Sequence, residues 1–431
     1  MKKISELIQK EEERQRQTLM MIPSENYTWP EVKRALGSCL GQKYSEGYPG
    51  KRYYQGNAFI DQIELLTQKL ALKAFGLNSK SWAVNVQAHS GSIANLAVYN
   101  GLVEPGQPIM AMHLFHGGHL SHGWHSPTNK LTLSSKAWDF HFYGVDKETK
   151  LLDYEEIEKQ AKKIKPKMIV SGGTAYPREI DHQKLGKIAK SVGAYYLADV
   201  AHEAGLIAGG ANSSPFVNAD VVTMTTQKTL RGPRGAIIFS RQELAERIDR
   251  AVFPGLQGGP HNHTIAGIAV ALEKATHKEF ANYAKQTVAN AQRLSTVFRK
   301  TGLNLVSGGT DKHLLLIDLR SLGLAGPFLA NALELAGIVS NYNTVPFDTG
   351  SPMFPSGLRL GTPALTVRGM KEAEMELIAG WILEVIKMLE NKGLTQKDDL
   401  PDFKNKMADN KLIREVSQKV EELCLRFPIP E

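Results

Sequence analysis

Short apolar runs alternate with amphipathic helical segments between residue 81 and about residue 240. Turn-forming residues bound the runs, as is typical of buried strands. The helical segments between them, such as 154–163 and 183–191, repeat apolar residues at intervals of three and four. This alternation predicts an α/β domain whose mostly parallel sheet is covered by helices on both faces. The predicted strands are residues 82–86, 109–112, 168–171, 195–198, 221–224 and 236–239.

The pattern differs on either side of this region. Before it, the sequence predicts an exposed helix at 5–20, a polar and aromatic stretch at 24–57, and an amphipathic helix at 58–75. After it come helices at 263–275 and 280–300, a strand at 313–319, a helix at 327–336, a Pro- and Gly-rich loop at 346–363, and helices at 371–389 and 402–426. The predicted parts are an N-terminal helical arm (1–22), a large α/β domain (23–262), connecting helices (263–300) and a small C-terminal α+β domain (301–431).

Composition narrows the class of protein. The chain has 431 residues, of which 42% are hydrophobic and 22% charged, as in ordinary globular proteins. Two cysteines, Cys39 and Cys424, cannot build a disulfide framework or a cysteine zinc site. No apolar run is long enough to span a membrane and no signal peptide is visible, so we expect a cytoplasmic protein. Its formal charge of +8 favours anionic partners.

Lys228 is the first candidate for chemistry. It follows a predicted buried strand in the run Thr-Thr-Gln-Lys-Thr-Leu at 225–230. Lysine forms Schiff bases with aldehydes, and desolvation favours its neutral, nucleophilic form. Taken alone, a lysine at such a position can also be purely structural.

Two further β-α junctions carry matching signals. Asp199 ends a predicted strand, and ligands of open α/β sheets bind at the carboxyl ends of strands. A carboxylate there could pair with the ring nitrogen of pyridoxal phosphate, although Asp is also a common helix cap. Ser90, Gly91 and Ser92 open a predicted helix, where backbone N–H groups bind phosphate or are simply capped. The coincidence of phosphate seat, ring carboxylate and lysine favours a pyridoxal phosphate site.

Two other features are more ambiguous. His113, His116, His119, His122 and His125 recur every third residue, but intervening glycines break any helix that would align them and no acidic residue lies nearby in the sequence. We therefore expect no metal site. Arg359 lies in the run Ser-Gly-Leu-Arg-Leu-Gly-Thr-Pro at 356–363, where a guanidinium can clamp a carboxylate or can lie on the surface.

These residues lie in longer runs that resemble the serine hydroxymethyltransferase family over nearly the whole chain. The most specific run is Lys-Tyr-Ser-Glu-Gly-Tyr-Pro-Gly-Lys-Arg-Tyr-Tyr at 43–54. Other matching runs lie at 23–27, 89–92, 116–123, 199–202, 228–235, 252–260, 307–311 and 357–363. The resemblance implies the aspartate-aminotransferase-type fold with a seven-stranded-type sheet. It also implies a homodimer, or a dimer of dimers, with active sites shared between chains. The implied reaction transfers the hydroxymethyl group of serine to tetrahydrofolate, giving glycine and 5,10-methylenetetrahydrofolate.

The resemblance also implies roles for individual residues. Lys228 would hold pyridoxal phosphate as a Schiff base, Asp199 would pair with its ring nitrogen, and His119 would stack on its face. The phosphate would be bound by Ser90, Gly91 and Ser92, near Thr225, and by Tyr54, Gly258 and Gly259 of the second chain. Ser24, His202 and Arg359 would contact the substrate hydroxyl, the ring oxygen and the substrate carboxylate. Glu46 and Tyr44 would reach in from the second chain, Glu46 to transfer protons and Tyr44 to orient the substrate. The folate site would comprise Tyr53, Leu114, Gly118, His119, Leu120, Asn343, Ser351, Pro352 and Met353.

Some positions depart from the family pattern. Gln227 stands where His usually precedes the lysine, Met353 where Phe is common, and residues 124–138 look expanded. These departures leave open a folate-independent aldolase acting on 3-hydroxy amino acids. A basic nucleic-acid-binding protein is disfavoured because Lys228, Asp199 and Arg359 are intact.

Overall fold

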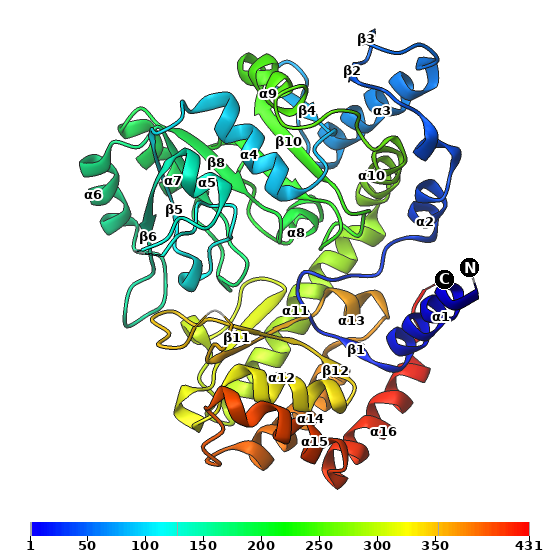
Figure 1. Ribbon diagram of the computed structural model, residues 1–431, viewed down its shortest axis with the longest axis vertical. Helices are drawn as coiled ribbons and strands as arrows, with labels where there is room; N and C mark the ends of the chain where they lie inside the picture. The colour runs from blue at the N-terminus through cyan, green and yellow to red at the C-terminus, as the bar shows by residue number, and fades with distance from the viewer. Residues whose placement is uncertain (1, 127, 352, 431) are drawn as a thin grey trace. The chain divides into compact units, whose positions relative to one another are not determined.

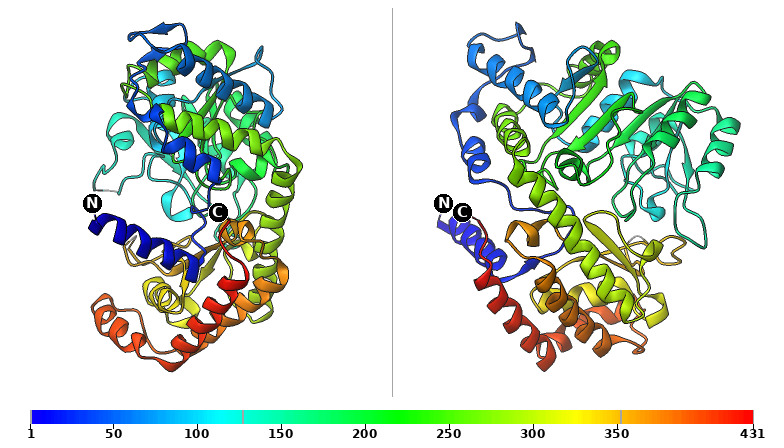
Figure 2. Two further views of the ribbon diagram at one scale, coloured as in Figure 1. Left: turned by 90° about the vertical axis from the view of Figure 1, so that its right-hand side faces the viewer. Right: turned by 180° about the vertical axis from the view of Figure 1, so that it is seen from behind.

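The computed structural model describes residues 2–126, 128–351 and 353–430. Contacts divide the chain into two compact units. One comprises Thr28–Lys285, and the other comprises Met1–Tyr27 together with Gln286–Glu431. The elements of both units are shown in Figure 1 and Figure 2. Each unit has its own sheet and its own apolar core. The four-part division predicted from the sequence stays a prediction.

A seven-stranded sheet forms the centre of the Thr28–Lys285 unit. Its strands are β4 (Trp82–Asn85), β5 (Pro108–Met112), β6 (Asp139–Tyr143), β7 (Met168–Ser171), β8 (Tyr195–Asp199), β9 (Val221–Thr225) and β10 (Ala236–Arg241). Their order is β4-β10-β9-β8-β7-β5-β6, and β10 is antiparallel to both of its neighbours while the other pairs are parallel. The predicted mostly parallel α/β sheet is therefore confirmed.

Strand β6 is absent from the sequence prediction. Its sequence, Asp-Phe-His-Phe-Tyr, alternates polar and aromatic residues in place of a continuous apolar run. It lies at the edge of the sheet and pairs only with β5, so the side chains of Asp139 and His141 can remain outside the core. A strand with one solvent-exposed face alternates polar and apolar residues, and a search for continuous apolar runs does not detect it.

Helices cover both faces of this sheet, because alternate residues of each strand point to opposite faces. Met110 and Met112 of β5 pack into one core, whereas Ile109 and Ala111 pack into another. The first core is completed by α3 (Ala58–Ala74), α6 (Tyr154–Ile164), α7 (His182–Ser191) and α10 (Asn262–Ala275), and the second by α4 (Gly91–Leu102) and α9 (Ala245–Val252). The remaining elements of the unit include α2 (Pro30–Leu36), β2 (Gly47–Tyr48), β3 (Lys51–Arg52), α5 (Leu133–Ala137) and α8 (Ala204–Ala208).

The other unit contains a three-stranded antiparallel sheet of order β11-β14-β13. Its strands are β11 (Leu314–Asp318), β13 (Asn341–Asn343) and β14 (Gly357–Gly361), while β1 (Leu19–Met20) pairs in parallel with β12 (Ile338–Val339). Its helices are α1 (Lys2–Gln17), α12 (Gly326–Leu335), α13 (Pro363–Val367), α14 (Glu372–Leu389), α15 (Leu400–Ala408) and α16 (Lys411–Arg426). Helix α11 (Lys278–Lys300) begins in the first unit and ends in this one.

Two predictions for this unit are wrong. The predicted loop 346–363 contains β14, which is buried along its whole length as the central strand. Its glycines suggested a loop, but they leave room for the neighbouring backbone: a Cβ on Gly357 would lie 2.6 Å from the Asn343 carbonyl oxygen. The predicted helix 402–426 is broken, because the Asn410 side chain accepts a hydrogen bond from the Ile413 backbone N–H and caps α16.

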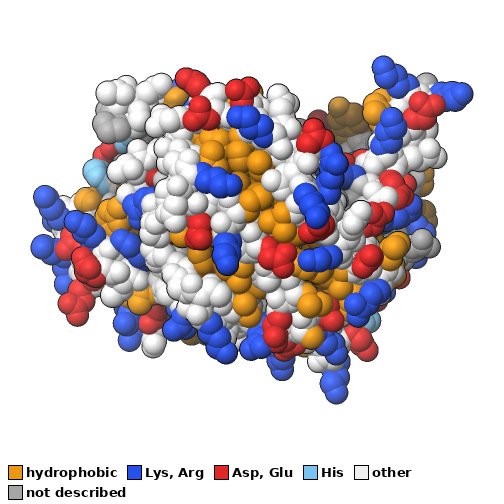
Figure 3. Space-filling model, turned by 90° about the horizontal axis from the view of Figure 1, so that it is seen from below, with side chains coloured by type: hydrophobic (Ala, Val, Ile, Leu, Met, Phe, Trp, Pro, Cys, Tyr) orange, Lys and Arg blue, Asp and Glu red, His pale blue; other side chains and the backbone are white. Residues whose placement is uncertain are grey.

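No helix in the described part of the chain combines the length and apolar character needed to cross a membrane. In Figure 3, acidic and basic side chains are interspersed over the face shown, with apolar side chains exposed between them. The net charge of +8 is therefore not gathered into one basic patch on this face.

Candidate active site

A carboxylate with several hydrogen-bond donors marks the end of strand β8. Asp199 is the last residue of this strand, pairs in register with Thr223 of β9, and has a side chain that is 10% exposed. One carboxylate oxygen accepts a hydrogen bond from the Ala201 backbone N–H at 3.0 Å. The other accepts one from Asn95 Nδ2 at 2.8 Å and lies 3.0 Å from His122 Nε2.

These contacts keep Asp199 ionised. Burial alone would raise the pKa of the Asp199 carboxyl, but the hydrogen bond and charge of His122, the charge of His119 and the hydrogen bond from Asn95 together hold it well below its usual range. The sheet edge therefore carries a fixed negative charge at a largely buried position. Such a charge favours a cationic N–H group in a ligand.

Asn95 connects this carboxylate to His119. The Thr223 hydroxyl donates to Asn95 Oδ1 at 2.7 Å, which leaves the amide nitrogen to donate to Asp199 and, at 2.9 Å, to the Ser121 hydroxyl. That hydroxyl lies 2.7 Å from His119 Nδ1, which also accepts the Ser121 backbone N–H at 3.1 Å. Nδ1 is thus an acceptor, so a neutral His119 ring carries its proton on Nε2.

Lys228 lies in the loop that follows the neighbouring strand, β9. Two hydroxyl groups bind the end of β9 and this loop to the segment after β8: Thr225 donates to the Ala201 carbonyl at 3.2 Å, and Thr229 to the His202 carbonyl at 2.9 Å. The side chains of Lys228 and His202 are buried. Because β8 and β9 are parallel, Asp199 and Lys228 follow the same edge of the sheet.

The N-terminus of α4 is open beside the same edge. Ser90 is its N-cap and accepts a hydrogen bond from the Ile93 backbone N–H, while Ser90 and Ser92 are exposed. A Cβ on Gly91 would lie only 2.6 Å from the Thr225 side chain, so this position requires a residue without one. Free backbone N–H groups and two hydroxyls at a helix N-terminus suit a phosphate group.

A second set of predicted site residues gathers on the surface of this unit. We call it the tyrosine cluster, comprising Tyr44, Glu46, Tyr53, Tyr54, Gly258 and Gly259. The rings of Tyr44 and Tyr54 lie 5.5 Å apart, and a Cβ on Gly258 would lie 3.1 Å from Glu46 Oε1. Tyr44 is 61% exposed and Tyr53 71%. These residues come from two distant segments of one chain and gather at its surface, with the rings of Tyr44 and Tyr53 exposed.

Arg359 and Ser24 belong to the other unit. Arg359 is buried in the middle of β14, and its Nε donates to Asn341 Oδ1 at 3.1 Å. Burial lowers the pKa of the Arg359 guanidinium to about 10, so it remains charged at neutral pH. Ser24 is half-buried in the segment after β1.

The predicted folate residues are divided between the two units. In the first, Leu114 is half-buried, Leu120 is 52% exposed, and a Cβ on Gly118 would lie 2.2 Å from the Met112 carbonyl oxygen. In the second, Asn343 ends β13, Ser351 accepts a hydrogen bond from the Phe354 backbone N–H, and Met353 is 75% exposed. Pro352 lies outside the described residues.

The histidine row contributes two members to the site. His119 and His122 lie in the Asp199 network, whereas His116 Nδ1 accepts the Val145 backbone N–H and His113 caps a single helical turn. The expectation of no acidic residue nearby holds in the sequence but is wrong in space, since the sheet brings Asp199 beside His122.

Four contributing residues escaped the sequence analysis: Asn95, Ser121, His122 and Thr223. Two of them had a usable signal. Asn95 lies four residues after Gly91 and therefore on the same face of α4. Thr223 lies two residues before Thr225 and therefore on the same face of β9.

Comparison with known proteins agrees with this geometry. A family model described as serine hydroxymethyltransferase matches residues 1–382. A serine hydroxymethyltransferase of Methanosarcina barkeri is 51% identical over 98% of this chain and 97% of its own. One from Acidothermus cellulolyticus is 51% identical over 89% of this chain and 87% of its own, and one from Caenorhabditis elegans is 45% identical over 99% and 88%. The chain belongs to the serine hydroxymethyltransferase family and is thereby an enzyme of the transferase class.

Proposed function

We propose that this chain binds pyridoxal phosphate at the carboxyl edge of its seven-stranded sheet and transfers the hydroxymethyl group of serine to tetrahydrofolate, yielding glycine and 5,10-methylenetetrahydrofolate. The observation that carries the proposal is the ionised Asp199 carboxylate beside the loop of Lys228. The open N-terminus of α4, with Gly91 against Thr225, supports it independently.

Pyridoxal phosphate supplies a protonated ring that takes up the negative charge developing at the amino acid during the reaction. Asp199 would accept the ring N–H, Lys228 would be the point of covalent attachment, and the N-terminus of α4 would hold the phosphate. His119 would stack on the ring, kept in one orientation by Ser121. His202 would contact the ring oxygen, and Thr225 would line the phosphate seat.

The remaining residues would handle the substrates. Arg359 would bind the carboxylate of serine or glycine, and Ser24 its hydroxyl. Glu46 would hold or move a proton while Tyr44 orients the substrate. The folate site would comprise Tyr53, Leu114, Gly118, His119, Leu120, Asn343, Ser351, Pro352 and Met353.

The tyrosine cluster supports a homodimer, or a dimer of dimers, with shared sites. Helix α3 of the same unit also exposes apolar side chains: Phe59, which is 77% exposed, Leu65 and Leu66. Exposed apolar groups of this kind are typical of protein interfaces. Glu46, Tyr54, Gly258 and Gly259 would serve the site of the second subunit. A cytoplasmic location is part of the proposal, supported by the free thiols of Cys39 and Cys424.

Borohydride reduction of the pyridoxal phosphate-loaded protein, followed by peptide mapping, tests the attachment point. We expect the label on Lys228 and loss of the visible absorption band in Lys228→Ala, with Lys274→Ala as the control. Label on another lysine would refute the site. Serine cleavage is expected to require tetrahydrofolate, and rapid cleavage without it would favour the folate-independent aldolase.

A further inference from the structure

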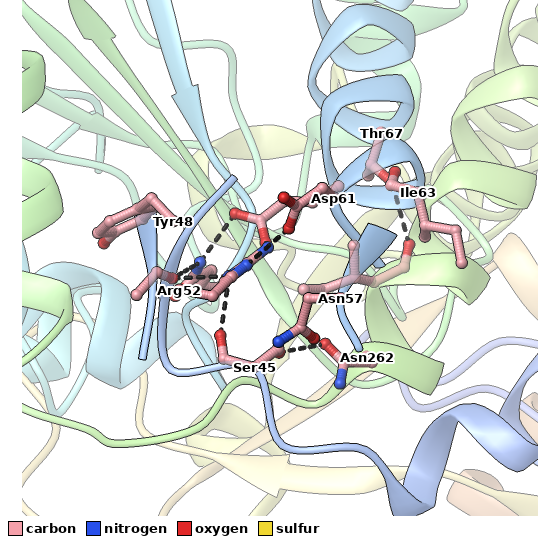
Figure 4. A network of polar contacts seen from close by, with 12 residues as sticks. Ser45, Tyr48, Arg52, Asn57, Asp61, Ile63, Thr67 and Asn262 are labelled. Carbon is pink, nitrogen blue, oxygen red and sulfur yellow. Dashed lines mark hydrogen bonds and ion pairs between the residues drawn. The ribbon is translucent and has the colours of Figure 1, made fainter. Parts of the chain in front are cut away.

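A buried arginine lies directly beneath the tyrosine cluster. Arg52 is the last residue of β3, and only 4% of its side chain is exposed. Its guanidinium donates to Asp61 at 2.8 Å (Figure 4) and to Glu64 at 2.6 Å, and both carboxylates belong to α3. Two carboxylates on a single guanidinium are more than its charge requires, and Glu64 is itself buried.

The remaining donor of Arg52 binds the main chain on both sides of Glu46. Nη1 donates to the Ser45 carbonyl at 2.8 Å and to the Gly47 carbonyl at 2.7 Å. The Glu46 carbonyl accepts the Tyr53 backbone N–H at 3.0 Å. Three consecutive carbonyl groups are thereby fixed, and with them the backbone that carries the half-buried Glu46 side chain.

Other side chains also hold the segment 45–47 in place. Gln87 Nε2 donates to the Gly47 carbonyl at 3.0 Å and to Glu64 at 2.8 Å. The Ser45 hydroxyl donates to Asn262 at 2.6 Å (Figure 4). Gly47 has a φ of +93°, and a Cβ there would lie 2.3 Å from the Lys51 carbonyl oxygen, so the turn admits no other residue without strain.

We propose that Arg52 is a positioning residue for Glu46 and acts through it on the active site of the second subunit, not on the site of its own chain. The inference rests on the proposed shared site. Arginine is required because its planar fork reaches two carboxylates and two carbonyls at once, whereas the ammonium group of lysine is a single point. Displacing a catalytic group by about 1 Å can cost about a hundredfold in rate.

Hybrid dimers carrying two different affinity tags distinguish the two directions of action. In the trans hybrid, one subunit carries Lys228→Ala and the other Arg52→Lys. One of its sites then combines an intact Lys228 with a Glu46 held by an intact Arg52. We expect this hybrid, loaded with pyridoxal phosphate, to retain about half of the wild-type activity per dimer.

In the cis hybrid, one subunit carries both Lys228→Ala and Arg52→Lys, and the other is wild type. Its intact Lys228 is served by the Glu46 of the doubly substituted subunit. We expect kcat to be at least about tenfold below that of the matched hybrid lacking Arg52→Lys, with little change in the KM for serine.

The reverse pattern, an inactive trans hybrid and an active cis hybrid, would show that Arg52 supports its own site and overturn the inference. Equal loss in both would show a general structural role and also overturn it. A Lys228→Ala with Glu46→Gln hybrid tests the shared site separately. If that hybrid is active, an unexpected result with the Arg52→Lys hybrids refutes only the role of Arg52. If it is inactive, the shared site itself is refuted. Should Arg52→Lys not fold, Gln87→Met removes the second donor to Gly47 and is expected to give the same pattern at a smaller amplitude.

Discussion

Asn95→Asp replaces the amide group at the centre of the Asp199 network with a carboxylate and leaves the side-chain shape almost unchanged. It removes the N–H donor that lies 2.8 Å from one Asp199 oxygen and puts a second carboxylate there. Two carboxylates at this distance share a proton, so the pKa of Asp199 is expected to rise and the fixed charge at the sheet edge to weaken. The hydrogen bond to Ser121, and with it the orientation of His119, is lost as well.

The expected loss follows from the contact removed. A hydrogen bond to a charged acceptor contributes about 1.5–3 kcal/mol, which corresponds to a factor of roughly 10–150. We expect pyridoxal phosphate affinity and the kcat of serine cleavage each to fall within this range. Thr223→Val removes the hydroxyl that orients the Asn95 amide and is expected to cost about 1 kcal/mol, or about fivefold.

Cofactor affinity is measured by titrating the apoprotein and following visible absorption, and kcat by steady-state kinetics with tetrahydrofolate. Asn100→Asp is the matched control, because Asn100 is exposed on the same helix. It introduces the same charge, and we expect less than a twofold effect. If folded Asn95→Asp kept both quantities within about threefold of wild type, Asn95 would not be what holds Asp199 in its ionised, oriented state.

Two further predictions concern stability. Burial, and to a smaller extent the charge of Glu64, raise the pKa of Asp249 from its ordinary 3.8 to about 6, although the hydrogen bond from Asn85 lowers it. The native carboxyl therefore holds its proton more tightly than the unfolded one, and the native state loses stability as the pH rises from about 3.8 to about 6. Asp249→Asn should raise the free energy of unfolding in urea by up to about 3 kcal/mol at pH 8 and by almost nothing at pH 4, and an equal effect at both would contradict it. Arg368, which is buried, donates five hydrogen bonds to carbonyl groups at the C-terminal ends of α1 and α16. Arg368→Lys should cost about 2–4 kcal/mol in the same assay because one ammonium group cannot reach them all, whereas the exposed Arg414→Lys should be neutral.

The large sheet was predictable because its inner strands are buried on both faces and read as continuous apolar runs. The edge strand β6 and the glycine-rich strand β14 were not. Polar and aromatic residues alternate in β6, and the glycines of β14 allow a close approach of the neighbouring backbone. Local composition records burial on both faces well. It records edge position and interstrand distance poorly, because these depend on which strand lies alongside.

The candidate site follows the same division. Lys228, Asp199 and Ser90 could be predicted as candidates because each stands at a β-α junction with its own local signal. His122 and Asn95 were missed because their roles are set by a residue 77 and 104 positions away, respectively. The spacing of Asn95 from Gly91 indicates its face of α4, but only the folded chain shows that its partner is Asp199. The tyrosine cluster was found only through the family resemblance, since its members share no spacing.

The arginines show why net charge alone could not locate the anionic ligands. The guanidinium of Arg52 is already paired with two carboxylates of its own chain, Asp61 and Glu64. Arg231 lies with its guanidinium 3.6 Å from the centre of the Trp29 ring, and burial lowers its pKa to about 10. Arg359 has a similarly lowered pKa, but its Nε contacts the neutral amide of Asn341. The surroundings of each buried guanidinium, and not the sum of +8, therefore decide whether it can serve an anionic ligand.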